Sequence, residues 1–342
     1  MLRGIRYGRP CMQTYLYGYI ALVKPKVIVT LIDNSLPFYF INHRFPKAIT
    51  IAIQNGRRDN FGRKPNTGLL DLLQIDHGWG KPTISHYCMF GEAEISLLRK
   101  YIRANFIATG NLQNNSYPQK PLTARARPKI SFVSSHPNLS HDLSTTALSH
   151  DTYMHTGNRT ISFFEYYRIE RDVAKVVGQY CAENNLDFHI VGKRPETTPQ
   201  EHAFYAEALG EIPFTFHPCS TEGASYPRLL DSDVVVTVDS TIAYELFGRG
   251  KRVAFISVRG EAIGHSSIDF CRFASPLSTP DTGNNWTNTF DPMVIKSKLE
   301  FVRSSSQSEW EDATKSIAPQ LVYFDEGNTR IRSLFTSLGL AR

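Results

Sequence analysis

The residues most suited to chemistry stand where an apolar run at 234–238 meets a segment with helical character, at Asp239, Ser240 and Thr241. A buried strand of this kind delivers Asp239 to its carboxyl end, and Ser240 or Thr241 is a suitable N-cap. The amides of a helix's first turn and the helix dipole attract anions, and two hydroxyls beside them can donate to phosphate oxygens. The pattern therefore predicts a phosphate site at this turn, although a plain capped helix explains it equally well.

Two side chains one turn further along the same segment could serve the same ligand. Tyr244 can reach the cleft beyond the strand, and Glu245 is placed to accept hydrogen bonds from a ribose. The alternative is that Glu245 only compensates the dipole at the start of the helix.

A second polar cluster follows the apolar run at 48–53 and contains Gln54, Asn55, Arg57 and Asp59. The glycine between them permits a tight turn. Arg57 offers a rigid fork of donors that suits a carboxylate or a phosphate. Asp59 could act as a base or pair with a neighbouring arginine. A solvated turn is the simpler interpretation, and composition alone slightly favours it.

Three further positions are candidates with ordinary alternatives. Arg194 follows the apolar run 188–191 and could neutralise a departing phosphate, or lie on a surface loop. Glu92 and Glu94 open a predicted helix and could be general acids or bases, although an acidic first turn is common and is favoured here. Trp286 could stack on a base or sugar, or pack over a junction between domains.

Composition limits the classes of protein that fit. The chain has 342 residues, of which 41% are hydrophobic and 20% charged, which predicts a globular protein of two domains. The net charge of +6 suits phosphate ligands or an anionic membrane surface, but no basic run alternates with aromatics as in nucleic-acid binders. Five scattered cysteines predict neither a disulfide framework nor a zinc site. We expect no metal and no cofactor, because no ligand spacing or Asp-x-Asp motif is present.

Neither a signal peptide nor a stretch of the roughly 20 apolar residues needed for a membrane span is recognisable, so the sequence predicts a cytoplasmic protein.

Strand-like runs alternate with helical segments along most of the chain. In the first half these runs cover 26–32, 48–53, 84–90 and 106–109, and in the second half 129–133, 188–191, 234–238 and 252–256. β-branched runs that end in Gly, Asn or Asp are typical of parallel sheets in doubly wound α/β domains.

The segment 114–128 is rich in Asn, Pro, Gln and Arg and resembles a linker, and 134–158 is predicted to be a loop. We therefore expect an N-terminal domain over 1–116, a linker over 117–128 and a C-terminal domain over 129–342.

Several segments, in order, resemble the bacterial surface-polysaccharide and O-antigen biosynthesis proteins, a family of GT-B glycosyltransferases related to the retaining Kdo transferases. They are KPKVIVTLIDNS at 24–35, ITIAIQNGRRD at 49–59, HYCMFGEAE at 86–94, IATGNLQNN at 107–115, DSDVVVTVDSTIAYELFGRGKRVAFI at 231–256 and GNNWTN at 283–288. The resemblance implies two Rossmann-like domains with a cleft between them. That family usually has a further β-α unit before the first strand, so the N-terminal domain is expected to be trimmed.

The resemblance also implies a function. It suggests metal-independent transfer of a sugar, Kdo or a related acidic sugar among the options, from a nucleotide donor such as a CMP-linked sugar to a surface glycan or lipid-linked glycan, with peripheral contact at the inner membrane. Ser240, Thr241, Tyr244, Glu245 and Arg194 would bind the nucleotide. The substrate side would be lined by Gln54, Asn55, Arg57 and Trp286, and the catalytic candidates are Asp59, Glu92 and Asp239. If a covalent sugar adduct forms, Asp151, Asp172 and Asp239 are alternatives. A nucleotide-sugar epimerase and a non-catalytic binding subunit remain rival functions.

Overall fold

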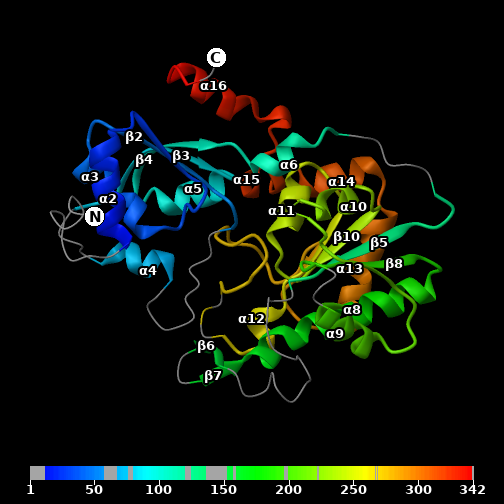
Figure 1. Ribbon diagram of the computed structural model, residues 1–342. Coiled ribbons are helices and arrows are strands. Elements are labelled where there is room, and N and C mark those ends of the chain that lie inside the picture. The colour runs from blue at the N-terminus through cyan, green and yellow to red at the C-terminus, as the bar shows by residue number, and fades with distance from the viewer. Residues whose placement is uncertain are drawn as a thin grey trace.

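The computed structural model describes residues 12–57, 68–75, 80–119, 125–135, 152–156, 159–195, 199–221, 223–265, 267 and 269–340. It contains two parallel sheets, each flanked by helices, in two lobes; the N-terminal lobe is at the upper left of Figure 1, and the C-terminal lobe lies to its right and below. The predicted α/β class with two Rossmann-like domains is therefore confirmed.

The N-terminal lobe is built on a four-stranded parallel sheet in the order β1-β2-β3-β4. Its strands are β1 (Val27–Thr30), β2 (Ile49–Ile53), β3 (Thr83–Met89) and β4 (Arg103–Ala108). Around them lie α2 (Met12–Val23), η1 (Leu36–Phe40), α3 (Ile41–Arg44), α4 (Leu69–Gln74) and α5 (Glu92–Leu98). The β-branched residues of β2 are buried on both faces, which is what the near-continuous apolar run predicts.

The C-terminal lobe holds a six-stranded sheet in the order β12-β11-β10-β5-β8-β9, with every neighbouring pair parallel. The strands are β5 (Lys129–Val133), β8 (Asp187–Val191), β9 (Thr215–His217), β10 (Val234–Thr237), β11 (Val253–Ile256) and β12 (Trp286–Thr287). Its helices are α8 (Phe163–Glu183), α9 (Pro199–Leu209), α10 (Ser225–Leu230), α11 (Thr241–Gly248), α12 (Arg259–Ala262), α13 (Pro292–Ser304) and α14 (Gln307–Thr314). Because β10 is central, whatever follows it lies at the middle of the carboxyl edge.

Part of the stretch predicted as a loop is a hairpin. The strands β6 (Thr152–Thr156) and β7 (Arg159–Ser162) pair antiparallel and lead directly into α8. Ser162 and Glu165 form a capping box that fixes where α8 begins.

The junction of the two lobes is held by α6 (Leu112–Ser116) and the residues after it. The buried side chain of Arg249 donates to the carbonyl oxygens of Asn114, Tyr117 and Pro118, each at 3.1 Å. The ring of Tyr117 stacks on that of Tyr226 with centroids 5.2 Å apart. The start of the predicted linker is therefore fixed to the C-terminal lobe.

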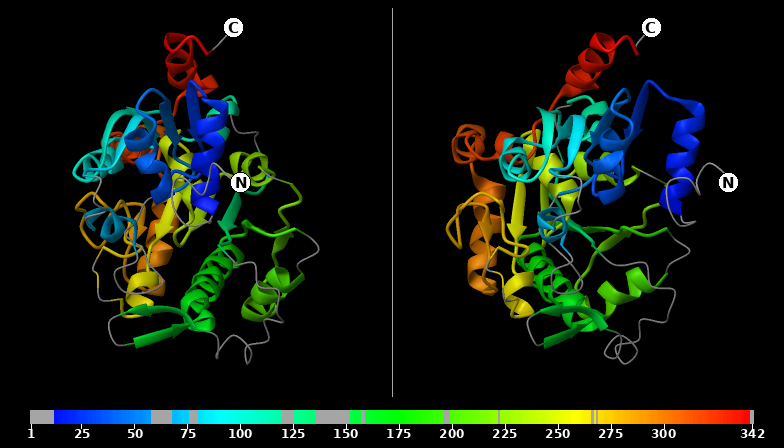
Figure 2. Two further views of the ribbon diagram at one scale, coloured as in Figure 1. Left: turned by 60° about the vertical axis from the view of Figure 1, so that its left-hand side comes forward. Right: turned by 90° about the vertical axis from the view of Figure 1, so that its left-hand side faces the viewer.

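After α14 the chain returns to the N-terminal lobe through α15 (Ala318–Leu321), η2 (Glu326–Asn328) and α16 (Thr329–Ser337). Ile331 and Leu334 of α16 pack with Ile51, Ile53 and Cys88 of the N-terminal sheet. Figure 2 shows α16, in red, at the top of the molecule in both views. The two lobes are thus connected twice.

This return passes close to two glycines. A Cβ on Gly91, after β3, would stand 2.3 Å from the carbonyl oxygen of Gln320, and one on Gly248, at the end of α11, would stand 2.2 Å from that of Val322. Only glycine permits the backbones to approach this closely.

Among the residues that the structure describes, no helix is both long enough and apolar enough to cross a membrane.

Candidate active site

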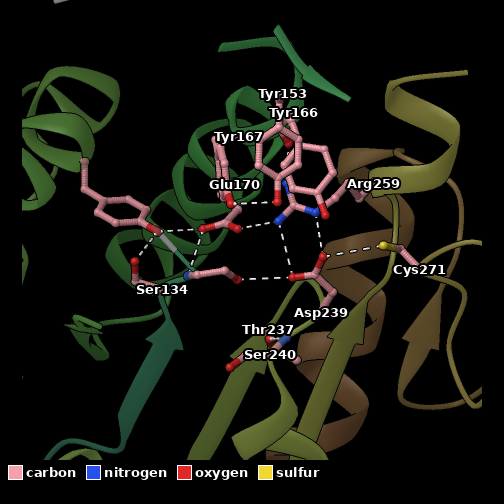
Figure 3. A network of polar contacts seen from close by, with 12 residues as sticks. Ser134, Tyr153, Tyr166, Tyr167, Glu170, Thr237, Asp239, Ser240, Arg259 and Cys271 are labelled. Carbon is pink, nitrogen blue, oxygen red and sulfur yellow. Dashed lines mark hydrogen bonds and ion pairs between the residues drawn. The ribbon is translucent and has the colours of Figure 1, made fainter. Parts of the chain in front are cut away.

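Asp239 stands at the carboxyl end of β10 and forms the centre of a polar network (Figure 3). Its Oδ2 lies 2.6 Å from Nε of Arg259, and its Oδ1 accepts from the Ser135 hydroxyl at 3.1 Å. The thiol of Cys271 lies 3.6 Å from Oδ2. Ser135 and Arg259 follow β5 and β11, which flank β10, so the sheet topology brings these two partners to Asp239.

The network continues into the interior through Arg259, whose side chain is fully buried. Its guanidinium also pairs with the equally buried Glu170 of α8 and lies over the ring of Tyr166, 4.3 Å from the centroid. Tyr205 donates to Glu170 at 2.9 Å. One cation thus bridges two carboxylates, an arrangement that tolerates burial only because each charge is paired.

The paired charges fix the protonation state of Asp239. Burial disfavours the ionised carboxylate, but the charge and hydrogen bond of Arg259, together with the hydrogen bonds from Ser135 and Cys271, outweigh burial and hold the pKa of Asp239 below its ordinary value. Asp239 is therefore a carboxylate at neutral pH.

Ser240 and Thr241 open α11 directly beside this network. Ser240 occupies the N-cap position with extended backbone, as predicted, but its side chain makes no capping hydrogen bond. The turn is stabilised instead by Thr237, whose hydroxyl accepts from the Ser240 amide at 2.9 Å. Both Ser240 and Thr241 are half-buried. The helix therefore begins without a side-chain cap, which leaves the amides of its first turn for another acceptor.

Arg57 of the N-terminal lobe lies across the start of α11. Its guanidinium stands 3.9 Å from the centroid of the Tyr244 ring, and its backbone amide lies 3.5 Å from Oγ1 of Thr241. Its Nη2 donates to the carbonyl oxygen of Ser275 at 2.5 Å. The structure thus brings together two clusters that the sequence separates by more than half of the chain.

Behind Arg57, the N-terminal lobe contributes two buried polar side chains. Gln54 donates to the carboxylate of Glu94 and accepts from the amide of Phe90 at 2.8 Å. Oε1 of Glu94 lies 4.0 Å from Nε of Arg57. Of the two acidic residues that open α5, Glu94 is buried beside this contact, whereas Glu92 is exposed.

Tyr244 and Glu245 are buried inside the protein and are not at its surface. Both are almost fully buried, and the ring of Tyr244 packs on Phe255 with centroids 4.5 Å apart. The carboxyl of Glu245 accepts a hydrogen bond from the hydroxyl of Tyr226, and burial raises the pKa of Glu245 to about 8. In this structure Glu245 thus contacts protein groups at the junction of the lobes.

The remaining predicted residues lie around this centre. Arg194 is half-buried after β8, where its amide donates to the buried carboxylate of Glu201 at 2.8 Å. Trp286 stacks on Phe273 with centroids 4.7 Å apart. Asn55 is exposed, and its backbone N–H donates to the carboxylate of Asp33 at 3.2 Å.

Three of the predicted carboxylates lie elsewhere. Asp59 and Asp151 fall outside the described residues. Asp172 lies on the surface of α8 in a pair with Arg168, the atoms 3.5 Å apart.

Sequence reasoning missed Arg259, Glu170 and Ser135. Arg259 and Ser135 each follow a strand within three residues, so the rule that polar residues gather at carboxyl ends would have found them. Glu170 shares a helical face with Val173 and Val177, and a charge on an apolar face is a signal of buried pairing.

Taken together, the site offers hydroxyls and an uncapped helix start on one lobe and a guanidinium with a buried carboxylate on the other. These groups can bind an anion and hold a proton acceptor nearby. No group of three or more His, Cys, Asp or Glu within the described ranges could hold a metal ion.

Solved structures with the same fold include enzymes that act on activated sugars. A UDP-N-acetylglucosamine 2-epimerase superposes with a TM-score of 0.54 and 12% identity, over 96% of this chain and 77% of its own. The UDP-GlcNAc 2-epimerase of Methanocaldococcus jannaschii, solved with UDP-GlcNAc and UDP, gives 0.51 and 10% identity over 95% and 80%. The wall teichoic acid polymerase TagF, as its H444N variant, gives 0.51 and 11% identity over 91% and 72%. At these identities the likeness concerns the fold.

Comparison with curated proteins gives no match. A family model described as "putative O-antigen biosynthesis protein" matches residues 51–338, which cover the N-terminal lobe from β2 onward, the C-terminal lobe, and both Arg57 and the start of α11. On that match, the chain belongs to this O-antigen biosynthesis family.

Proposed function

We propose that the protein transfers a sugar from a nucleotide donor to a surface glycan, with the leaving phosphate bound at the start of α11. The observation that carries the proposal is the placement of Arg57 over the first turn of α11, where Ser240 makes no capping bond. A helix start without a side-chain cap and an opposing guanidinium suit a departing phosphate. Membership of the O-antigen family supports a role in glycan assembly.

Within this proposal the two lobes have separate tasks. The hydroxyls of Ser240 and Thr241 and the helix amides stabilise the negative charge that develops on the leaving group. Arg57 adds a positive charge from the opposite lobe, and Arg194 is a second candidate cation. Glu94 is buried beside Arg57, whereas Glu92 is exposed, so we assign to Glu94 the removal of the proton from the attacking hydroxyl of the receiving glycan. Asp239 holds Arg259 and thereby the turn on which Ser240 stands.

The donor we propose is a nucleotide-linked sugar, and a CMP-linked acidic sugar such as CMP-Kdo is the specific candidate. Release of free nucleotide would be measured with CMP-Kdo, UDP-GlcNAc and CDP-glycerol, with and without O-antigen fragments as acceptor. The double variant Ser240→Ala/Thr241→Ala should lower turnover about 100-fold, because donors to a developing anion are lost. Ser306→Ala is the matched control, since Ser306 caps the remote helix α14.

Unchanged turnover in the double variant would remove the phosphate role. Conversion of a donor without any acceptor would assign an epimerase instead. Binding of nucleotide with no turnover on any donor–acceptor pair would assign a binding subunit.

We further propose that α2 and the edge strand β1 touch the cytoplasmic face of the inner membrane. Large apolar side chains here are 41–63% exposed: Tyr15, Leu16, Tyr19, Leu22, Val23, Val29, Leu31 and Ile32. The opposite face of α2 packs inward through Tyr17 and Ile20. The right-hand view of Figure 2 shows α2, in dark blue, on the outer edge of the N-terminal lobe.

The charge around this surface suits an anionic bilayer. Residues 12–53 contain four basic residues and a single acid, Asp33, which is fully buried. Apolar side chains among basic ones bind anionic membranes through both area and charge.

Cosedimentation with vesicles tests this contact. The protein should bind phosphatidylglycerol-containing vesicles more tightly than phosphatidylcholine vesicles, and Tyr19→Glu/Leu22→Glu should weaken binding at least tenfold. Met293→Glu, at an exposed apolar residue of α13, is the control. If the double variant changes only the oligomeric state and not vesicle binding, the surface is a protein contact and the membrane proposal is wrong.

A further inference from the structure

A cavity of about 280 Å³ lies apart from the start of α11, at the carboxyl ends of β11 and β12. It is a half-open hollow bordered by α12, by His265 and Ser267, and by residues that follow the two strands. Its lining includes Ser257, Glu261, His265, Phe270, Arg272 and Asn288. Ser257 directly follows β11 and Asn288 directly follows β12, and the two strands pair in parallel, so these side chains come from adjacent strand ends.

Two polar atoms in this lining are buried and have no hydrogen-bond partner within the part of the chain that the structure describes. They are the hydroxyl oxygen of Ser257 and the amide nitrogen of Asn288. Ser257 is 3% exposed. The other end of the Asn288 amide accepts from the Phe273 backbone at 3.0 Å, so the assignment of its nitrogen follows from that bond. Unsatisfied buried polar groups cost stability, so two of them on residues that line one cavity call for an explanation, and a bound ligand is one that can be tested.

A third donor belongs to His265. Nδ1 of His265 accepts from the Ser267 amide at 3.0 Å and lies 3.4 Å from the Ser267 carbonyl oxygen; the shorter contact favours the tautomer with the proton on Nε2, and burial lowers the pKa of the ring. The ring stacks on Phe270 with centroids 3.9 Å apart. The cavity is thus lined by donors beside an aromatic pair.

The charges of the lining argue against an anionic ligand. The guanidinium of Arg272 lies 2.9 Å from Asp281 and donates to the carbonyl oxygen of Thr279 at 2.6 Å, so its charge is compensated. Glu261 adds a carboxylate, one oxygen of which accepts from the Phe290 amide at 2.7 Å. The formal charges of Arg272, Asp281 and Glu261 therefore sum to a negative value.

We infer that this cavity binds one neutral sugar residue of a glycan. A sugar hydroxyl can accept from Asn288 and donate to Glu261, and it can do either with Ser257, which an anion cannot. The volume suits a single monosaccharide unit, below the usual range for larger ligands.

The inference concerns binding and does not require transfer at α11. The two places are nevertheless adjacent in the chain, because Phe270 precedes Cys271, which contacts Asp239.

Calorimetric titration of the full chain with the methyl glycosides of glucose, galactose, mannose and N-acetylglucosamine tests the inference directly, with inorganic phosphate and CMP as charged probes. At least one methyl glycoside should bind. Ser257→Ala and Asn288→Asp should each weaken its binding roughly three- to tenfold, the loss expected for one neutral hydrogen bond. CMP binding should stay unchanged, which separates this cavity from the start of α11.

The matched control is Ser131→Ala. Ser131 is also a buried serine of this sheet, but its hydroxyl is bonded to that of Ser232 at 2.6 Å. Ser131→Ala should lower the melting temperature and leave glycoside binding unchanged. Ser257→Ala should do the opposite, weakening binding while leaving the melting temperature equal or higher, because it removes an unsatisfied group.

Absence of binding by all four glycosides, or binding that Ser257→Ala and Asn288→Asp do not change, would overturn the inference and leave the cavity to ordered water. Phosphate binding that is lost in Ser257→Ala would overturn it as well, in favour of an anion site.

Discussion

Glu245 shows how a side chain's surroundings can differ from what its position in the sequence suggests. Its place one turn into a helix predicts a ribose contact, but it is buried against Tyr226 at the junction of the lobes. Periodicity identifies the residue and its helix, whereas its partner comes from a helix nearly twenty residues earlier in the chain. Pairing of that kind is set by tertiary packing and cannot be read from a local pattern.

The raised pKa of Glu245 makes stability depend on pH. The folded state keeps the proton up to about pH 8, whereas an unfolded glutamic acid loses it near its ordinary value of 4.5. Stability should therefore be highest below that value and decline as the pH rises towards 8.

Glu245→Gln removes this ionisation and keeps an acceptor for Tyr226. The variant should gain on the order of 2 kcal/mol over the natural chain at pH 8 and little at pH 5. Urea unfolding at the two pH values measures the difference, and an equal effect at both would contradict the proposed cause.

At the level of elements, the sequence predicted most strands of the two parallel sheets, but not the end of α5 or the hairpin β6–β7. The run 129–133 coincides with β5, and 188–191 and 252–256 match β8 and β11 within a residue. The helix predicted to open at Glu92 is α5, which ends at Leu98, and β4 begins at Arg103. The hairpin β6–β7 lies in a polar stretch without alternating apolar residues, so its pattern gave no strand signal.

The glycine at the end of α11 is an element-level constraint that can be tested. In Gly248→Ala the new Cβ would meet the Val322 carbonyl, which cannot move without shifting the return of the chain. We expect a loss of about 1–3 kcal/mol in the free energy of unfolding, the usual cost of overpacking.

Gly178→Ala in α8 is the matched control, because its Cβ would meet side-chain atoms of Ile212, Leu209 and Phe188 at 3.0 to 3.2 Å and no backbone carbonyl. It should be neutral or stabilising through helix propensity. Denaturant unfolding of both variants gives the comparison, and equal losses would argue against the close-approach explanation.

At the scale of the whole molecule, the sequence predicts two lobes and the edge where polar residues gather, but not how the lobes meet. Arg57 and Thr241 were separate candidates, and their contact follows from the geometry between the lobes. The packing of α16 on the N-terminal sheet was not predicted either, since a short amphipathic helix does not indicate which sheet it covers.

That packing has a consequence for biosynthesis. As the ribosome makes the chain, Ile51, Ile53 and Cys88 emerge early, but α16, which covers them, is made only after the whole C-terminal lobe. Until then the nascent N-terminal sheet has an uncovered apolar face, the kind of surface that chaperones recognise. Completion of the first lobe therefore has to wait for translation of the second.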